Sequence, residues 1–236
     1  GDDQMTVKNV GILGAGKVGI VLAELALAAG YDVRISGSGK VSKIELTIQT
    51  LVPGAIASEN QDVIANSELI ILALPLSRYR QIPATALDGK LVIDAMNYWW
   101  ETDGVREEVL DPQTSSSEQV QQYFKGSHLV KTLNHMGYHN LQEDARPNGD
   151  PARKALLVAG DEPQAVATVA HFVETLGFDP ISYPRLADGI MTEPGSPLFG
   201  ASLSATALQQ IIDHFDETDF GRALAAKHAL DAETNE

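Results

Sequence analysis

Short apolar runs alternate with segments of helical periodicity along most of the chain. The apolar runs predict β-strands at residues 8–13, 32–36, 55–57, 69–73, 91–94, 128–132, 155–159 and near 178–182. Between them, apolar residues recur at the spacing of one helix face, which predicts helices at residues 18–29, 41–51, 61–65, 79–86, 117–124 and 163–176. Because this alternation is typical of βαβ units, we predict an α/β fold with a doubly wound, mostly parallel sheet.

Two of these helices carry signals for their ends. Asp161 can cap the last helix, Pro163 suits its first turn, and Gly177 can end it. In "DPQTSSSE", Ser115 and Glu118 have the spacing of a capping box, which predicts the start of a helix rather than a linker.

The pattern changes after Tyr183. A Gly/Pro-rich stretch, "PRLADGIMTEPGSPLFGASLS", is followed by helical patterns from Ala205 onward. We therefore predict a dinucleotide-binding sheet domain at residues 7–183 and a small loop and helical extension at residues 184–236.

Composition narrows the class of protein. The 236 residues can bury a substantial core, and 44% hydrophobic with 21% charged residues is typical of a globular chain. No apolar run approaches the roughly 20 residues of a membrane helix, and no secretory signal is recognisable, so we expect a cytoplasmic protein without a membrane partner. The absence of cysteine excludes disulfides, iron–sulfur ligation and thiol catalysis. A net charge of -15 argues against nucleic acid as a partner, except at a local basic pocket.

A glycine motif provides the first functional signal. "KNVGILGAGKVGIVLAELALAAGYDVRIS" places Gly14, Gly16 and Gly19 in G-x-G-x-x-G spacing, between a predicted strand and a predicted helix. In this Rossmann-type arrangement Gly14 allows the tight turn, Gly16 admits a pyrophosphate, and Gly19 lets the helix pack on the strand. The helix N-terminus then offers free amides and the positive end of its dipole to the phosphates.

The residues after the second strand indicate which nicotinamide cofactor is preferred. An Asp or Glu there would bind the adenine ribose hydroxyls and repel a 2'-phosphate. This chain instead has the uncharged residues Ser36, Gly37 and Ser38, followed by Lys40 and Lys43. Hydroxyls, loop amides and ammonium groups suit a phosphate, so we predict NADP rather than NAD.

Three loops are expected at the carboxyl edge of the sheet, where ligands bind in such folds. "LALPLSRYR" brings Leu74 and Pro75, "LVIDAMNYWW" brings Asn97 and three aromatic residues, and the third loop is "VKTLNHMGYHNL". Trp99 and Trp100 either pack beneath the C-terminal extension or form a wall of a substrate pocket.

Other chemistries lack their motifs. His135 and His139 stand four apart, but Gly137 intervenes and no H-E-x-x-H pattern completes a metal site, so we predict none. No G-x-S-x-G nucleophile elbow occurs either. Redox chemistry carried by the cofactor remains, in which the protein holds two reactants face to face.

Several segments in a fixed order identify a resemblance. They are "GILGAGKVG", "SGSG", "ALPL", "LVIDAMNYWWE", "SSSE", "VKTLNHMGYH", "AGDE" and "LGFDP". Over residues 8 to about 200 the chain resembles the NADPH-dependent coenzyme F-420 reductases, also called F-420-dependent NADP oxidoreductases. The resemblance implies a homodimer that moves a hydride directly between a nicotinamide and a deazaflavin stacked in one cleft.

The resemblance also implies roles for individual residues. Those expected at the pyrophosphate are Ala15, Gly16, Lys17 and Val18, and those expected at the 2'-phosphate are Ser38 and Lys43. Pro75 and Leu76 would line the cofactor, while Asn134, His135 and Met136 would border the two rings. His135 is then either an orienting group or proton donor for the deazaflavin, or a hydrogen-bonded loop histidine.

The chain departs from the better-known members of that family at two places. They often have an arginine where this chain has Gly39, which leaves the strength of 2'-phosphate binding open. The tryptophan-rich loop also differs, so the acceptor can differ. A reductase for a flavin, a quinone or a ferric chelate, and a non-catalytic NADPH-binding redox sensor, are the alternatives.

Overall fold

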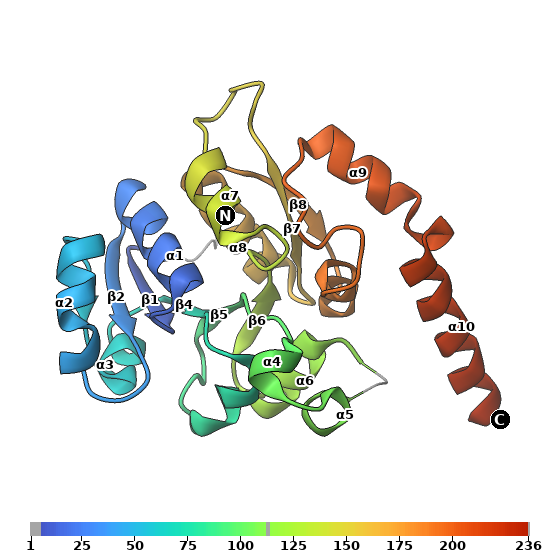
Figure 1. Cartoon of the computed structure of the whole chain (residues 1–236), viewed down its shortest axis with the longest axis horizontal. Coiled ribbons are helices and arrows are strands. Elements are labelled where there is room, and N and C mark those ends of the chain that lie inside the picture. Colours follow the sequence, from blue (N-terminus) through green and yellow to red (C-terminus); the bar gives the residue numbers. More distant parts are fainter. Residues whose placement is uncertain (1–5, 112–113, 236) are drawn as a thin grey trace.

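The computed structural model describes residues 6–111 and 114–235, and its strands form one eight-stranded sheet (Figure 1). The strands are β1 (Asn9–Leu13), β2 (Asp32–Ser36), β3 (Ile56–Ala57), β4 (Leu69–Leu72), β5 (Leu91–Asp94), β6 (His128–Lys131), β7 (Ala155–Ala159) and β8 (Asp179–Tyr183). Their order across the sheet is β3-β2-β1-β4-β5-β6-β7-β8. The strands from β1 to β6 are parallel, whereas β7 runs antiparallel to β6 and parallel to β8. The predicted α/β fold with a doubly wound, mostly parallel sheet is confirmed.

Helices cover both faces of this sheet. The α-helices are α1 (Lys17–Ala28), α2 (Ser42–Leu51), α3 (Asn60–Ala65), α4 (Trp100–Asp103), α5 (Arg106–Val109), α6 (Ser116–Tyr123), α7 (Tyr138–Asp144), α8 (Pro163–Leu176), α9 (Ala205–Asp213) and α10 (Asp219–Thr234). Three 3-10 helices, η1 (Leu76–Gln81), η2 (Leu186–Thr192) and η3 (Phe215–Glu217), complete the described elements.

Side chains of the central strands alternate between two hydrophobic cores. In β4, Leu69 and Ile71 join the core that α1, α7 and α8 cover, whereas Ile70 and Leu72 join the core under α3, η1 and α6. All four side chains are fully buried, as expected for a parallel strand covered on both faces. A third core joins β7 to α9 and η3, so these two helices pack on the far part of the sheet, and α10 extends away from it beyond them (Figure 1).

The predicted helix ends agree with the structure except at one residue. Ser115 and Glu118 form the reciprocal capping box of α6, and α8 has Pro163 in its first turn and Gly177 in the left-handed conformation at its end. The N-cap of α8 is Glu162 and not Asp161. The Asp161 carboxylate instead accepts the Leu186 amide at 2.8 Å, which holds the start of η2.

The helix predicted at residues 79–86 is wrong in type and extent. The chain forms the 3-10 helix η1 from Leu76 to Gln81 instead. Ile82 then has extended backbone angles, φ -86° and ψ 131°, because the ring of the following Pro83 disfavours the helical conformation at the residue before it. Among the residues described, no helix is long and apolar enough to cross a membrane.

Candidate dinucleotide and acceptor site

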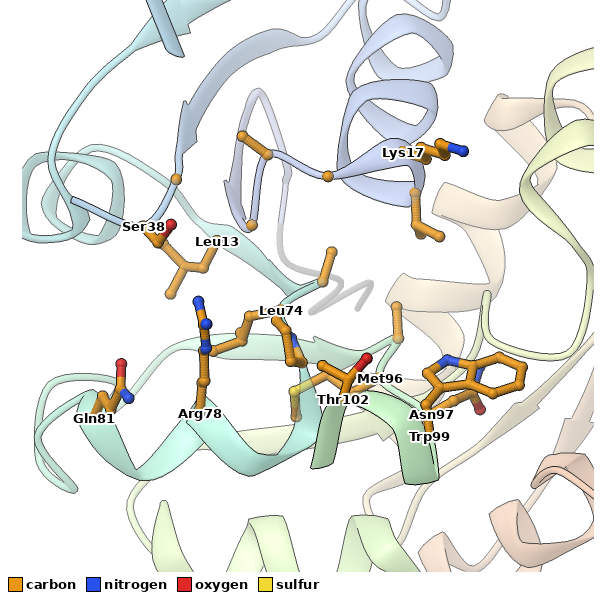
Figure 2. Close-up of a pocket in the computed structure, with 18 of the residues that line it drawn as sticks. Leu13, Lys17, Ser38, Leu74, Arg78, Gln81, Met96, Asn97, Trp99 and Thr102 are labelled. Atoms are coloured by element: carbon orange, nitrogen blue, oxygen red, sulfur yellow. The ribbon is translucent and has the colours of Figure 1, made fainter. Parts of the chain in front are cut away.

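The strand order reverses between β1 and β4, and a cavity of about 790 Å³ opens at the carboxyl ends of these strands. Such a switch point is where open α/β sheets bind ligands, and the volume lies within the usual range for cofactor sites. The cavity is lined by Leu13, Gly14, Ala15, Gly16, Lys17, Val18, Gly37, Ser38, Ile44, Asn60, Ala73, Leu74, Pro75, Arg78, Gln81, Ile82, Ala95, Met96, Asn97, Trp99, Thr102 and Tyr138. Figure 2 shows side chains from the loops after β1, β2, β4 and β5 around it.

Each of the three motif glycines is required for a different geometric reason. Gly14 has φ +124°, and a Cβ there would stand 2.4 Å from the Ala73 carbonyl oxygen. A Cβ at Gly19 would stand 1.9 Å from the Gly14 carbonyl oxygen, so only glycine lets α1 begin this close to the loop. At Gly16 a Cβ would meet nothing within 4 Å, which leaves the space beside the backbone open to a ligand. Each glycine therefore has the role that a dinucleotide site requires.

The start of α1 is suited to a pyrophosphate. Gly16 is the N-cap with an extended backbone and no side-chain cap. The first helical hydrogen bond is from the Ile20 amide to the Gly16 carbonyl at 3.0 Å, so the amides of the preceding turn are not used within the helix. A phosphate at this position would accept hydrogen bonds from these amides and lie at the positive end of the helix dipole.

The charge of the cavity contrasts with the charge of the chain. The sequence carries a net charge of -15, yet the charged residues that line the cavity are Lys17 and Arg78, both cations. Among the described residues, no aspartate, glutamate or histidine lines the cavity. Local positive charge in an acidic protein fits an anionic ligand, and the residues present therefore fit a nicotinamide dinucleotide.

At the end of β2, the predicted residues separate into two groups. Gly37 and Ser38 line the cavity, and the loop has no carboxylate that would repel a 2'-phosphate. Ser36 is 1% exposed and its hydroxyl donates to the Asn60 side-chain oxygen at 2.5 Å, so it supports the loop from below. Lys43 is exposed and does not line the cavity, but its side chain lies against Gly39.

At the opposite end, the cavity is bounded by the loop after β5. Asn97 lines it and is held by a reciprocal pair of hydrogen bonds, from its amide nitrogen to the Asn134 carbonyl at 2.9 Å and from the Asn134 amide nitrogen at 3.2 Å. Trp99 also lines the cavity, is 47% exposed, and meets Phe199 edge-on with ring centroids 5.4 Å apart. Trp100 is 65% exposed and lies outside the cavity. Trp99 thus contacts both the cavity and the C-terminal extension, whereas Trp100 does not line the cavity.

A buried carboxylate positions Trp99. Asp103 is 8% exposed. One of its carboxylate oxygens accepts a hydrogen bond from the backbone amide of Ser77 at 3.0 Å, and the other accepts one from the backbone amide of Trp99 at 2.8 Å. It therefore joins the loop after β4 to the loop after β5. Sequence reasoning missed Asp103, because a carboxylate four residues after Trp99 in a polar segment is indistinguishable from a surface charge.

His135 does not occupy the position expected of a proton donor. Its side chain is 1% exposed and outside the cavity, and its Nε2 accepts the Leu157 amide of β7 at 3.1 Å. Burial lowers the pKa of His135 to about 4, so the ring is neutral near pH 7. The structure therefore corrects the proton-donor interpretation: His135 is a hydrogen-bonded histidine of the interior.

Other predicted residues also act from behind the cavity. Leu76 and Met136 are buried in the hydrophobic cores, and Gly19 lies beneath the phosphate loop. Asn134 holds Asn97 and also donates to the Thr192 side chain at 2.9 Å. None of these four residues lines the cavity.

The sequence did not single out several residues that line the cavity. They are Leu13, Ile44, Asn60, Ala73, Gln81, Ile82, Ala95, Met96, Thr102 and Tyr138. Tyr138 begins α7, and the Lys17 ammonium lies 5.4 Å from the centre of its ring. Only the position of Tyr138 in an expected edge loop could have indicated it.

A buried polar cluster lies behind the loop that carries Asn97. The Lys131 ammonium donates to the Met96 carbonyl at 2.6 Å and lies 3.4 Å from the Asp94 carboxylate. Asp94 also accepts the Met96 amide at 2.9 Å and the Ser117 hydroxyl at 2.8 Å. Glu193 completes the cluster. Burial raises its pKa to about 7, although the Lys131 charge acts in the opposite direction. The cluster holds the backbone of Met96, a lining residue, from below.

Fold and cavity together define a Rossmann-type α/β protein with a candidate dinucleotide site. Residues 9–98, from β1 into the loop after β5, match the family model described as NADP oxidoreductase, coenzyme F420-dependent. This matched segment contains the phosphate loop and most of the cavity lining.

Individual proteins extend the likeness beyond residue 98. The chain is 26% identical over 181 residues to the metalloreductase STEAP3 of Rattus norvegicus, a match that covers 76% of this chain and 34% of that protein. The chain therefore spans about a third of the length of this curated relative.

Two solved structures share the fold. An uncharacterised protein of Sinorhizobium meliloti is 25% identical with a TM-score of 0.71, covering 84% of this chain and 95% of that one. An Arthrobacter protein, provisionally assigned as an F420-dependent NADP reductase, is 24% identical with a TM-score of 0.66, covering 78% and 88%.

Proposed function

We propose that this protein transfers a hydride between NADP(H) and a deazaflavin, coenzyme F-420. The proposal rests on the residues that line one cavity, which runs from the phosphate loop to the wall formed by Asn97 and Trp99. The described residues that line it include cations for an anionic dinucleotide, and none of them has a carboxylate, an imidazole or a thiol for acid, base or nucleophilic chemistry. Direct hydride transfer needs no such group on the protein, because the nicotinamide supplies the reacting carbon.

The chain's own residues would bind, orient and exclude water. The phosphate loop and the start of α1 would fix the pyrophosphate, and Leu74 and Pro75 would present an apolar surface to the rings. Asn97 is already held by Asn134, so its side chain has one orientation before any ligand binds. Such preorganisation contributes to rate by holding two reactants in register.

Trp99 is the best candidate for the wall of the acceptor subsite. About half of its side chain is exposed, its edge packs against Phe199, and its backbone is held by Asp103. A planar tricyclic ring would bury this exposed aromatic surface by stacking, which favours the acceptor over a small aliphatic substrate.

Rapid mixing of the purified protein with NADPH and oxidised coenzyme F-420 tests the proposal. The expected result is loss of the deazaflavin absorbance band in step with loss of NADPH absorbance, with one NADPH consumed per deazaflavin. If the band persists at micromolar enzyme while NADPH is bound, the deazaflavin proposal is wrong. Tight NADPH binding without transfer to any acceptor would instead favour a redox sensor.

Paired tryptophan variants test the acceptor wall. Trp99→Leu is expected to raise the acceptor KM about tenfold or more, because stacking on an aromatic ring is worth about 1–3 kcal/mol per ring, with little change in NADPH affinity. Trp100→Leu is the matched control, because its side chain lies outside the cavity. Equal effects of the two variants would refute the subsite assignment.

A second candidate is the reduction of a flavin or a ferric complex with NADPH. The similarity to a protein named as a metalloreductase favours it, although this chain spans only 34% of that relative. A panel of acceptors at equal concentration separates the two: deazaflavin, FMN, a quinone and a ferric chelate. If kcat/KM is highest with FMN or with the ferric chelate, that acceptor takes the place of the deazaflavin in this proposal.

We also propose that the protein is a cytoplasmic homodimer. Light scattering coupled to size exclusion tests the assembly, and a single species of about 25 kDa, the mass of one chain, would contradict it.

A further inference from the structure

We propose that Arg78 recognises the 2'-phosphate of NADP(H) and so sets the preference of this chain for NADP over NAD. The inference rests on the dinucleotide-binding part of the proposed function and not on the identity of the acceptor. Arg78 comes from the loop after β4, on the other side of β1 from the loop after β2, where the sequence places phosphate recognition.

The loop after β2 offers less positive charge to the cavity than its sequence suggests. Ser38 lines the cavity, but Lys40 and Lys43 do not. Gly39 has φ +87°, and the position that its Cβ would take lies 3.4 Å from the Lys43 Cδ and 3.6 Å from the Lys43 Nζ. The Lys43 side chain thus lies along Gly39 and does not line the cavity. A phosphate bound at Ser38 would need a further cation from another element.

Arg78 is placed to supply that cation. It lies on η1 and lines the same cavity as Ser38. Figure 2 shows its guanidinium pointing from η1 into the cavity, toward Ser38 and Leu13. Because β1 lies between β2 and β4 in the sheet, the loops after β2 and β4 flank the phosphate loop on opposite sides. Ser38 and Arg78 thus line one cavity from two different loops.

Among the residues that the structure describes, Arg78 has no counter-ion. Within residues 6–111 and 114–235, none of the ion pairs or side-chain hydrogen bonds involves its guanidinium, and no acidic residue lines the cavity. Arg80, two residues later, differs: its guanidinium lies 5.4 Å from the centre of the Tyr79 ring, and it does not line the cavity. One arginine of η1 therefore has a partner within the protein, and the other faces the ligand site.

A guanidinium distinguishes the two cofactors by charge and shape. It can donate two parallel hydrogen bonds to a phosphate, and these charge-assisted bonds are stronger than those to a neutral hydroxyl. NAD has a hydroxyl at this position, so loss of Arg78 should affect its affinity much less. The expected loss for NADPH is about 10- to 100-fold, typical of removing hydrogen bonds to a charged group.

The test is equilibrium binding, which needs no acceptor. Dissociation constants for NADPH, NADH, adenosine 2',5'-bisphosphate and 5'-AMP are measured for the wild type, Arg78→Gln, Arg78→Lys and the control Arg80→Gln. Arg78→Gln is expected to weaken NADPH and the bisphosphate by 10-fold or more and NADH and 5'-AMP by less than twofold. Arg78→Lys should lose part of this effect, and Arg80→Gln none of it.

Three results would overturn the inference: equal weakening of NADPH and NADH in Arg78→Gln, unchanged NADPH binding in that variant, or a wild type with no preference for NADPH. Circular dichroism of each variant shows whether it is folded, and the Arg78→Lys variant keeps the test valid if the glutamine variant is not. If no acceptor is reduced but the binding pattern holds, the deazaflavin proposal fails and the Arg78 inference stands.

Discussion

Replacing Glu193 by glutamine is expected to stabilise the protein at neutral and alkaline pH. Glu193 is 6% exposed and belongs to the buried cluster with Asp94 and Lys131. Burial disfavours its charged form and raises its pKa from 4.5 to about 7, so the carboxyl group keeps its proton in the folded state at mildly acidic pH.

The sign of the pH dependence follows from the two pKa values. Below pH 4.5 the carboxyl is protonated in both states, so it adds no dependence on pH. Between pH 4.5 and about 7 the unfolded chain loses the proton and the folded chain keeps it, so the free energy of unfolding falls as pH rises. Above pH 7 the folded state contains a buried charge. The difference between the two pKa values corresponds to roughly 3 kcal/mol when fully expressed.

Urea unfolding followed by far-ultraviolet circular dichroism, at pH values from 5 to 8.5, measures the effect. The difference in unfolding free energy between Glu193→Gln and the wild type should grow in favour of the variant by about 2.5 kcal/mol across this range, because part of the effect is already present at pH 5. The control is Glu143→Gln, because that side chain is exposed. A difference that is constant with pH, or that shrinks as pH rises, would refute the assignment of a raised pKa to Glu193.

Three further variants test the interior and the loops. The pKa of His135 is lowered from 6.5 to about 4, so the wild type should lose stability as pH falls through this window, and His135→Gln should flatten the loss in thermal unfolding at pH 4.5 against pH 7. A wild type that keeps its stability at pH 4.5 would contradict this. Asp103→Ala removes the acceptor of the Trp99 amide, so it should cost about 1–3 kcal/mol in urea unfolding and raise the acceptor KM in steady-state assays. Gly19→Ala puts a Cβ 1.9 Å from the Gly14 carbonyl oxygen, so NADPH affinity in a fluorescence titration should fall at least about tenfold, and unchanged affinity would contradict the close approach of loop and helix.

The residues that could be predicted from the sequence are those whose constraints are local. Gly14, Gly16 and Gly19 mark the phosphate loop because a tight turn, an open approach and a close helix start require glycine at fixed spacing. The capping box of Ser115 and Glu118 likewise depends on positions three residues apart. The fold class could be predicted because the periodicity of apolar residues indicates which faces of a helix or strand are buried.

The direction in which each strand runs could not be predicted from local patterns. The sequence predicts strands at β7 and β8, but it does not show that β7 pairs antiparallel with β6. The path of the chain from β6 through α7 decides the reversal, because that connection determines whether β7 starts beside the amino end or beside the carboxyl end of β6.

The candidate site shows the same division. The amino-acid sequence by itself determined that a glycine motif of dinucleotide-binding spacing, a loop after β2 without acidic residues and three loops at the sheet edge exist. Only the tertiary structure decided that His135 is buried against Leu157, that Glu193 lies with Lys131, and that Arg78 faces the cavity. The reason is physical: exposure, pKa and the direction of a side chain depend on which distant segments pack around it, and the spacing of residues along the chain contains no measure of that packing.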